Sequence, residues 1–157
     1  MRRKLLLLLW ASAACNPRTA RPYFPPVTGA AQAEIRLNQK NATSALADVL
    51  RSDSLPLTRV VVGDGYLETA WFDSASKRAT GSRRLGPKVV QVRAWIDPTR
   101  QGYSLITVET VYRPLADPSL SFRDLDRQVP TDHPVGKRMT EIVTELAKLY
   151  APETGGK

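Results

Sequence analysis

The sequence predicts an α+β fold, a two-layer sandwich in which an antiparallel sheet of four to five strands carries two helices on one face. Two segments repeat apolar residues at helical spacing, and the stretches between them alternate apolar and polar residues as strands do. The chain has 157 residues, 42% of them hydrophobic and 24% charged, which suits one globular domain. The expected order of elements is β-α-β-β-β-β-α, within residues 33–151.

The first elements of the domain are a short strand and an amphipathic helix. Residues 33–37 alternate around Ile35 and Leu37, which predicts the strand. Asn41 is the expected N-cap of the helix, because its side-chain oxygen can accept from free backbone N–H groups in the first turn. Pro56 lies beyond the other end of the helix. The apolar stripe of this helix consists of Ala42, Ala45, Leu46, Val49 and Leu50.

A hairpin comes next. Residues 57–62 are rich in β-branched side chains, which favour strands, and Gly63-Asp64-Gly65 supplies the turn before residues 66–73. Large side chains fall on both faces of the second strand. We therefore expect one face to pack on a helix and the other to meet water or a partner.

Two longer strands complete the predicted sheet. Residues 88–97 alternate, with Gln91 and Arg93 on the face opposite the apolar one, and residues 103–113 alternate in the same way after a turn. The pattern predicts half-buried strands with one face toward the helices. The apolar face of the first of these strands consists of Val90, Val92, Ala94 and Ile96.

A loop and a second helix end the domain. Residues 114–133 contain three prolines and little periodicity, which predicts a long surface loop. Pro134 suits the first turn of a helix, with Asp132 or His133 as its N-cap. Residues 152–157 are expected to form a flexible tail. The apolar stripe of the final helix consists of Val135, Met139, Ile142, Val143, Leu146 and Leu149.

Residues 1–14 are typical of a secretory signal peptide. Basic residues at positions 2–4 precede an apolar run from Leu5 to Trp10, and small residues follow up to Ala14. The uncharged stretch would form about 15 Å of helix, against roughly 30 Å of hydrocarbon in a bilayer, so it is too short for a transmembrane helix. We therefore expect export from the cytoplasm.

The motif Ser12-Ala13-Ala14-Cys15 resembles the lipobox of bacterial lipoproteins. The resemblance implies that Cys15 becomes the first residue and carries the acyl chains that anchor the protein in a membrane. Asn16 after it resembles the enterobacterial sorting signal for the outer membrane. The alternative is cleavage after Ala13, which would leave Cys15 as a free thiol in a soluble periplasmic or secreted protein. Because Cys15 is the only cysteine, no intramolecular disulfide can form.

The chain between Cys15 and the domain is expected to be a tether. Residues 15–32 contain four prolines and no hydrophobic periodicity, which favours extended polyproline II. At about 3.1 Å per residue, such a tether would hold the domain on the order of 40 Å from its anchor. The predicted boundaries are therefore signal peptide 1–14, tether 15–32, domain 33–151 and tail 152–157.

Residues with catalytic or metal-binding chemistry are few. His133 is the only histidine, so a His-rich metal site is excluded, and a Ser-His-Asp triad would have to use a residue expected at a helix start. Two of the strand carboxylates could hydrolyse a glycoside. Glu68 and Glu109 are more readily explained as solvent-facing residues or as cross-strand partners of Arg93. We therefore predict no enzyme, no cofactor and no metal site.

A basic loop is the first candidate binding site. Its basic residues are separated by glycine and other small side chains, so the loop could bind anionic lipid, with a solvated hairpin tip as the alternative. Export argues against nucleic acid as a partner. The candidate anion-binding residues are Lys77, Arg78, Arg83, Arg84 and Lys88. A later charged group is expected to form a neutral, salt-bridged surface and consists of Arg123, Asp124, Asp126 and Arg127.

An outward sheet face is the second candidate site. Trp95 falls on the strand face opposite the apolar one, and we expect Trp71 to share that face. Exposed Trp and Arg side chains often anchor protein interfaces. The candidate interface therefore consists of Trp71, Arg93 and Trp95, with core packing or a cross-strand aromatic pair as the alternative.

The order of elements, together with the lipobox-like motif, resembles the helix-grip domains of the outer-membrane assembly lipoprotein BamC and of other small Gram-negative envelope lipoproteins. Residues 65–73, GYLETAWFD, are similar to the second hairpin strand of such modules. The resemblance implies an envelope scaffold or binding role and carries over no catalytic residue. We therefore expect a non-enzymatic module that is lipid-anchored to the outer membrane, faces the periplasm and binds an envelope protein. A carrier of lipid or a small ligand, and a hydrolase, are the alternatives.

Overall fold

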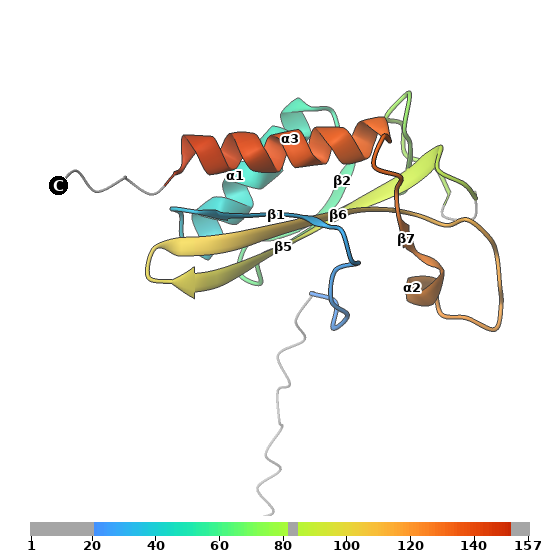
Figure 1. Ribbon diagram of the computed structural model, residues 1–157, viewed down its shortest axis with the longest axis horizontal. Coiled ribbons are helices and arrows are strands. Elements are labelled where there is room, and N and C mark those ends of the chain that lie inside the picture. The colour runs from blue at the N-terminus through green and yellow to red at the C-terminus, as the bar shows by residue number, and fades with distance from the viewer. Residues whose placement is uncertain (1–20, 82–84, 152–157) are drawn as a thin grey trace, which may run out of the picture.

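The computed structural model describes residues 21–81 and 85–151, and within them the chain forms an α+β fold with a seven-stranded antiparallel sheet and three helices (Figure 1). The helices α1 (Gln39–Ser52) and α3 (Pro134–Leu149) cover one face of the sheet. The N-terminal segment and α2 (Phe122–Leu125) lie on the other face. The predicted α+β class is confirmed, with more strands than expected. The predictions for the signal peptide, Cys15 and the tail fall outside the described residues.

Seven strands make up the sheet within the described residues. They are β1 (Ala31–Ile35), β2 (Leu57–Val61), β3 (Tyr66–Thr69), β4 (Phe72–Asp73), β5 (Val89–Arg100), β6 (Tyr103–Tyr112) and β7 (Arg127–Gln128). The strand order is β1-β6-β5-β3-β2, with β4 paired to β5 and β7 paired to β6. β5 pairs with one edge of β6. β1 and β7 both pair with the other edge, one after the other along the strand.

The two long helices begin close to the predicted positions. Asn38 caps α1, because its side-chain oxygen accepts from the backbone N–H of Asn41 at 3.0 Å. The helix therefore starts before Asn41, which was the expected cap. His133 is the N-cap of α3 and Pro134 lies in its first turn, as predicted. The predicted apolar stripe of α3 is buried except for Leu149, which is exposed at the end of the helix.

The main core lies between these two helices and the inner face of the sheet. The apolar face predicted for β5 is buried there, as expected from its alternation. Each fully buried aliphatic side chain stabilises the fold by about 1.5–3 kcal/mol. The principal contributors from β5, α1 and α3 are Val90, Val92, Ala94, Ile96, Leu46, Leu50, Met139 and Ile142.

A β-bulge interrupts residues 66–73, which were expected to form one strand. β3 and β4 both pair with β5, but the register shifts by one residue between them. Unbroken alternation would place Trp71 in the main core and Phe72 outside it. With the shift, Phe72 lies in the main core, and Trp71 packs with Val89 and Val111 on the opposite face.

Part of the expected tether is folded onto the sheet. Residues 21–28 run beneath it, and a turn closed by the Ala30 N–H and the Val27 carbonyl at 3.2 Å leads into β1 (Figure 1). Gly29 has a φ of +90° in this turn, a conformation that favours glycine. Phe24 and Val27 of this segment are partly buried against the second face of the sheet. Residues 21–32 therefore belong to the folded domain rather than to a free tether.

Candidate functional site

Charged residues alternate across the outer face of the sheet, the face away from α1 and α3. In register, Arg59 of β2 lies opposite Glu68 of β3. Arg93 of β5 lies between Glu68 and Glu109 of β6. The side chains of Arg93 and Glu109 form an ion pair at 2.9 Å, as predicted for cross-strand neighbours. Glu109 is fully buried, however, and is not a solvent-facing residue.

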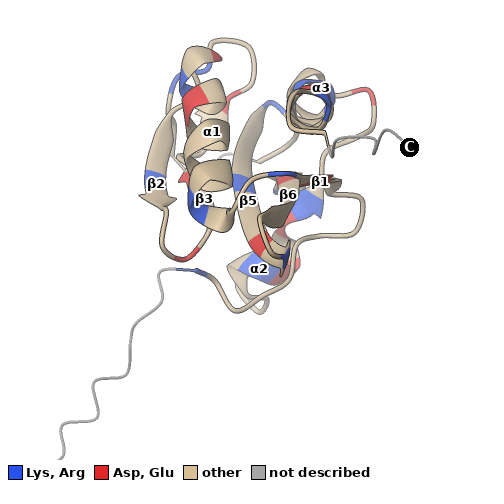
Figure 2. Cartoon of the chain, turned by 90° about the vertical axis from the view of Figure 1, so that its left-hand side faces the viewer, with Lys and Arg blue, Asp and Glu red and all other residues tan. Residues whose placement is uncertain are grey.

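Five ionisable side chains form a group on this face, which we call the arginine cluster; four of them are buried and Arg123 is partly buried. Arg93 bridges two carboxylates, at 2.9 Å from Glu109 and 2.8 Å from Asp126. Arg113 contacts the carboxylate of Asp126 at 2.9 Å, and Arg123 contacts that of Glu109 at 2.9 Å. Figure 2 marks basic and acidic positions on β5, β6 and α2 that come together beneath the sheet. The cluster thus joins α2 and the start of β7 to the two central strands.

Arg93, at the centre of the cluster, keeps its charge although it is buried. Burial lowers the pKa of Arg93, but the carboxylates of Asp126 and Glu109 outweigh this effect and hold that pKa above its usual value. Gln91 accepts a further hydrogen bond from the Arg93 guanidinium at 2.6 Å. Removing one partner from a buried ion pair costs about 3–5 kcal/mol. Because its acids and bases bind one another, the cluster holds elements together rather than offering a free acid or base.

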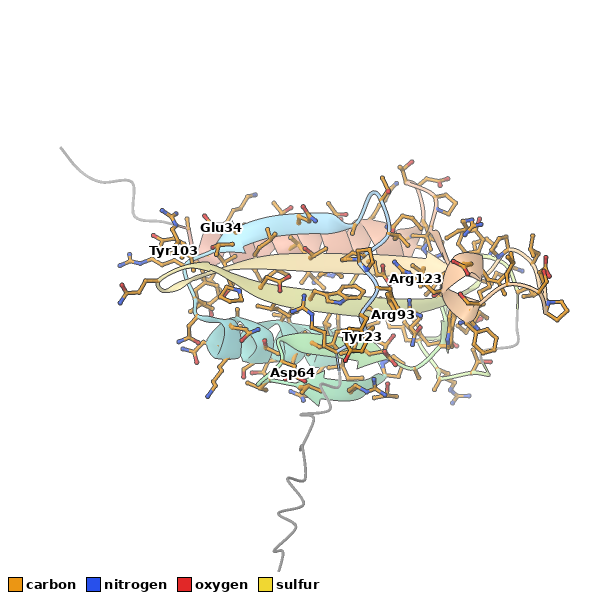
Figure 3. All side chains as sticks on the ribbon, turned by 90° about the horizontal axis from the view of Figure 1, so that it is seen from below. Tyr23, Glu34, Asp64, Arg93, Tyr103 and Arg123 are labelled. Carbon is orange, nitrogen blue, oxygen red and sulfur yellow. The ribbon has the colours of Figure 1, made fainter. Side chains whose placement is uncertain are left out.

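Residues 21–28, the N-terminal strap, cover the arginine cluster. The ring of Phe24 lies 4.4 Å from the Arg123 guanidinium and 5.5 Å from that of Arg93. Such cation–π contacts are stronger where water is excluded. The same ring meets the indole of Trp95 edge-to-face, with 6.2 Å between the centroids. Figure 3 views this face, with Arg93 and Arg123 near one another.

The backbone of the strap is also bound to the cluster. The N–H of Val27 donates to the Glu109 carboxylate at 2.8 Å. The Arg123 guanidinium donates to the carbonyl of Pro25. Glu109 therefore accepts from the strap, from β5 and from α2 at once, and its carboxylate links the three.

The predicted interface residues do share the outer face of the sheet, but they are not exposed. Trp71, Arg93 and Trp95 are 8%, 6% and 1% exposed. Phe24 covers Trp95, and the Arg113 guanidinium lies 4.5 Å from the ring of Trp71. The strap and the segment around α2 thus occupy the surface on which a partner was expected. Sequence alternation gives the correct face for Arg93 and Trp95, but not what covers that face, and for Trp71 the face depends on the β-bulge.

The described residues of the predicted anion-binding loop have different surroundings. Lys77 donates to the carbonyl of Asp53 at 2.5 Å and lies 3.9 Å from its carboxylate, at the end of α1. Arg78 and Lys88 are exposed. Arg83 and Arg84 fall outside the described residues. The loop therefore presents Arg78 and Lys88 to solvent, while Lys77 is bound to the helix layer.

The residues considered for catalysis are engaged in structural contacts. His133 donates from Nε2 to the carbonyl of Pro87 at 2.8 Å, since a carbonyl oxygen can only accept. Glu68 accepts from the Tyr66 hydroxyl at 2.5 Å, and Glu109 belongs to the arginine cluster. Burial, followed by the hydrogen bond and the charge of Glu68, raises the pKa of Tyr66 well above its usual value of 10.0.

Hollows of the described surface lie at the margin of the main core rather than inside it. Buried apolar side chains fill the space between α3 and the sheet, where the carrier alternative would place a ligand. An open hollow of about 580 Å³ lies beside α3 and is lined in part by Gln128 and Lys137. A shallower groove of about 980 Å³ runs between the strap and α2 and is lined in part by Pro26 and Leu120. Both are open to solvent rather than closed apolar chambers.

Sequence patterns did not single out Phe24 or Arg113, which complete this site. Asp126 and Arg123 belong to the group expected to be a neutral surface, and they do form ion pairs, but with buried residues of the sheet. The one local signal is Leu125, an apolar residue between charged neighbours that is buried in the structure. Such a residue indicates that a charged turn docks on a hydrophobic surface.

No family model matches the sequence, and no curated protein matches it. None of the helices among the described residues combines the length and apolarity that crossing a bilayer requires. Within residues 21–81 and 85–151, no three His, Cys, Asp or Glu side chains are grouped as a metal ion would need. A function for this chain is therefore inferred from its own sequence and from the geometry of the site.

Proposed function

We propose that this chain is a lipid-anchored, non-enzymatic binding module of a Gram-negative cell envelope, held at the outer membrane and facing the periplasm. The observation that carries the proposal is the lipobox-like motif ending at Cys15, which is followed at Arg21 by a strap bound to the folded domain. The remainder of the chain supplies a compact module that an anchor would hold close to a membrane.

The strap supports a short connection between the anchor and the domain. The side chain of Arg21 pairs with Asp97 at 2.7 Å, so the chain is held to the sheet from its first described residue. An extended chain from Cys15 to Arg21 spans at most about 20 Å. This is about half the reach expected of a free tether. The underside of the sheet would then face the membrane, with α1 and α3 directed away from it.

The contacts of the ionisable groups support binding rather than catalysis. Glu109 and Asp126 are bound by arginines, and the imidazole of His133 is bound to the carbonyl of Pro87. A catalytic acid or base needs a free position beside its substrate. In this site those positions are occupied by the strap and by α2, so the outer face serves as a docking surface for the chain itself.

The arrangement of α3 across the sheet supports the helix-grip part of the proposal. α3 has 16 residues and packs on the same face as α1. The long elements follow the order β-α-β-β-β-β-α expected for such modules, with β3 and β4 together in the place of one strand. The short α2 and β7 are additions within the segment that leads to α3.

Cell fractionation tests the anchor. The wild-type chain, produced in a Gram-negative host, should sediment with membranes and incorporate labelled palmitate. Cys15→Ala should lose the label, because it removes the only thiol that could be acylated. The domain begins beyond this position, so the variant should fold normally.

Ser12→Leu is the matched control for this experiment. It brings the motif closer to the lipobox pattern and should keep or increase the label. A wild-type chain that carries no palmitate, with Ser12→Leu equally unlabelled, would contradict lipidation at Cys15.

A further inference from the structure

Exposed apolar side chains gather at one end of the molecule. Among the described residues, six large apolar side chains are exposed. Three of them lie in the two loops that flank the start of β5 and the end of β6, and a fourth lies at the start of α2, directly after the second loop. These four are between 44% and 72% exposed. We call them the loop-end surface, which consists of Leu85, Leu115, Leu120 and Phe122.

The two loops are in contact, so these side chains belong to one region. The backbone N–H of Gly86 donates to the carbonyl of Arg113 at 2.7 Å, which places Leu85 beside the end of β6. The Arg113 guanidinium lies 4.5 Å from the ring of Phe122 and 4.5 Å from that of Trp71. Arg113 thus links the loop before β5 to α2. Figure 1 shows both loops at the same end of the sheet.

Basic side chains border this region. The backbone carbonyl of Arg78 accepts from the backbone N–H of Asp73 at 3.0 Å. That of Lys88 accepts from the backbone N–H of Ser74 at 2.8 Å, so both residues lie beside β4 at the same end of the sheet. Both are exposed, and neither has an ion-pair partner within residues 21–81 and 85–151. The acidic Asp117 in the neighbouring loop accepts from the Ser119 hydroxyl at 2.6 Å.

We propose that the loop-end surface docks on an anionic lipid bilayer. Leucines on loops and a phenylalanine at the start of a short helix, bordered by Lys and Arg, form the composition that enters the interface of an anionic membrane. Contact sites between proteins favour Trp, Tyr, Phe and Arg, whereas Leu is under-represented and Lys is depleted, and three of the four apolar residues here are leucines. The docking deepens the proposed function, because it would orient an anchored module on its membrane.

The position of the strap gives a second reason for a lipid partner. The strap and α2, which carries Phe122, lie on the same side of the sheet (Figure 1). The chain enters the domain from that side at Arg21. A lipid attached at Cys15 would therefore draw Leu120 and Phe122 toward the surface in which it is embedded.

A label placed on the surface tests the proposal without the lipid anchor. In the full chain with Cys15→Ser, Leu120→Cys is labelled with nitrobenzoxadiazole and mixed with vesicles of phosphatidylcholine and phosphatidylglycerol. The emission should shift to shorter wavelength, and nitroxide-bearing lipid should quench it. Leu149→Cys in the same background is the matched control, because Leu149 is exposed at the far end of α3. Its label should show neither change.

Two comparisons decide between a lipid surface and other partners. Arg78→Gln with Lys88→Gln should reduce the quenching at Leu120, and vesicles of phosphatidylcholine alone should do the same. A label at Leu120 that stays unquenched, or one quenched no more than the label at Leu149, would overturn lipid docking and leave the surface to a protein partner. Because Cys15 is replaced throughout, neither outcome bears on acylation.

Discussion

At the scale of single residues, Glu109 is the most constrained position of the outer face. Its carboxylate is fully buried and accepts from Arg93, from Arg123 and from the backbone of Val27. A buried carboxylate in such a place is stable only while all its donors remain. The loss of its charge would remove the carboxylate that pairs with Arg123 and one of the two that pair with Arg93.

We expect Glu109→Gln to lower the free energy of unfolding by about 3–5 kcal/mol, because the amide keeps the shape of the side chain but not its charge. Urea unfolding followed by circular dichroism would measure the change. Glu145→Gln is the control, since Glu145 forms an exposed ion pair with Arg138 at 3.3 Å and should cost less than about 1 kcal/mol. Equal small losses in both variants would show that the cluster contributes little.

The pairing of Arg93 with Glu109 could be predicted because alternation and antiparallel neighbours determine which side chains lie opposite one another. The burial of the pair could not be predicted in this way. It depends on Phe24, which is far away in sequence and lies in a proline-rich segment without periodicity. A contact made by one ring leaves no repeating pattern for sequence analysis to detect.

At the scale of elements, the hairpin β2–β3 depends on one glycine. Gly65 has a φ of +60°, and its carbonyl accepts from the backbone N–H of Ile96 at 2.8 Å. A Cβ at this position would lie 2.2 Å from the carbonyl oxygen of Ile96, which is a backbone atom that cannot move aside alone. The close approach holds the hairpin against β5.

Gly65→Ala should therefore lower the free energy of unfolding by more than about 1 kcal/mol, through both backbone strain and the clash. Gly63→Ala is the matched control in the same turn, since a Cβ at Gly63 meets no described atom within 4 Å. Thermal unfolding of the two variants side by side would measure the difference. A Gly65→Ala variant as stable as Gly63→Ala would contradict the close approach.

Long elements could be predicted and short ones could not. β5, β6 and α3 have 12, 10 and 16 residues, enough for a period to repeat. α2 has four residues and β7 has two, and both lie in a segment that was expected to be a loop. Elements of one turn or one residue pair are held by tertiary contacts, such as those of Arg123, rather than by their own pattern.

At the scale of the whole molecule, the strap and α2 form a partial third layer. An antiparallel sheet often leaves one face in water, but here most side chains of β5 and β6 are buried on both faces. Trp95 on the outer face is as well covered as Ile96 on the inner face. The strap therefore contributes to the stability of the domain as a whole.

Phe24→Ala should release the strap, because the ring is the main apolar contact between the strap and Trp95. We expect a loss of about 1–3 kcal/mol, less than for a core phenylalanine because Phe24 is only half-buried. Tryptophan emission should shift to longer wavelength, and acrylamide should quench it more strongly. Tyr23→Ala is the control, since Tyr23 is 96% exposed and should change neither signal. Unchanged quenching in Phe24→Ala would mean that the strap does not protect Trp95.

The edge strands of the sheet determine whether neighbouring copies of the protein can join by adding strands to one another. β2 is short, its register shifts between Leu57 and Arg59, and Thr58 and Arg59 are exposed on it. The opposite border is divided between β1 and β7. Interrupted, charged borders discourage a neighbouring copy from adding its own strand. Copies crowded together in two dimensions would collide often. Their edge strands would offer no long, regular row of backbone groups for another strand to pair with, so the copies could reach high density without forming fibrils.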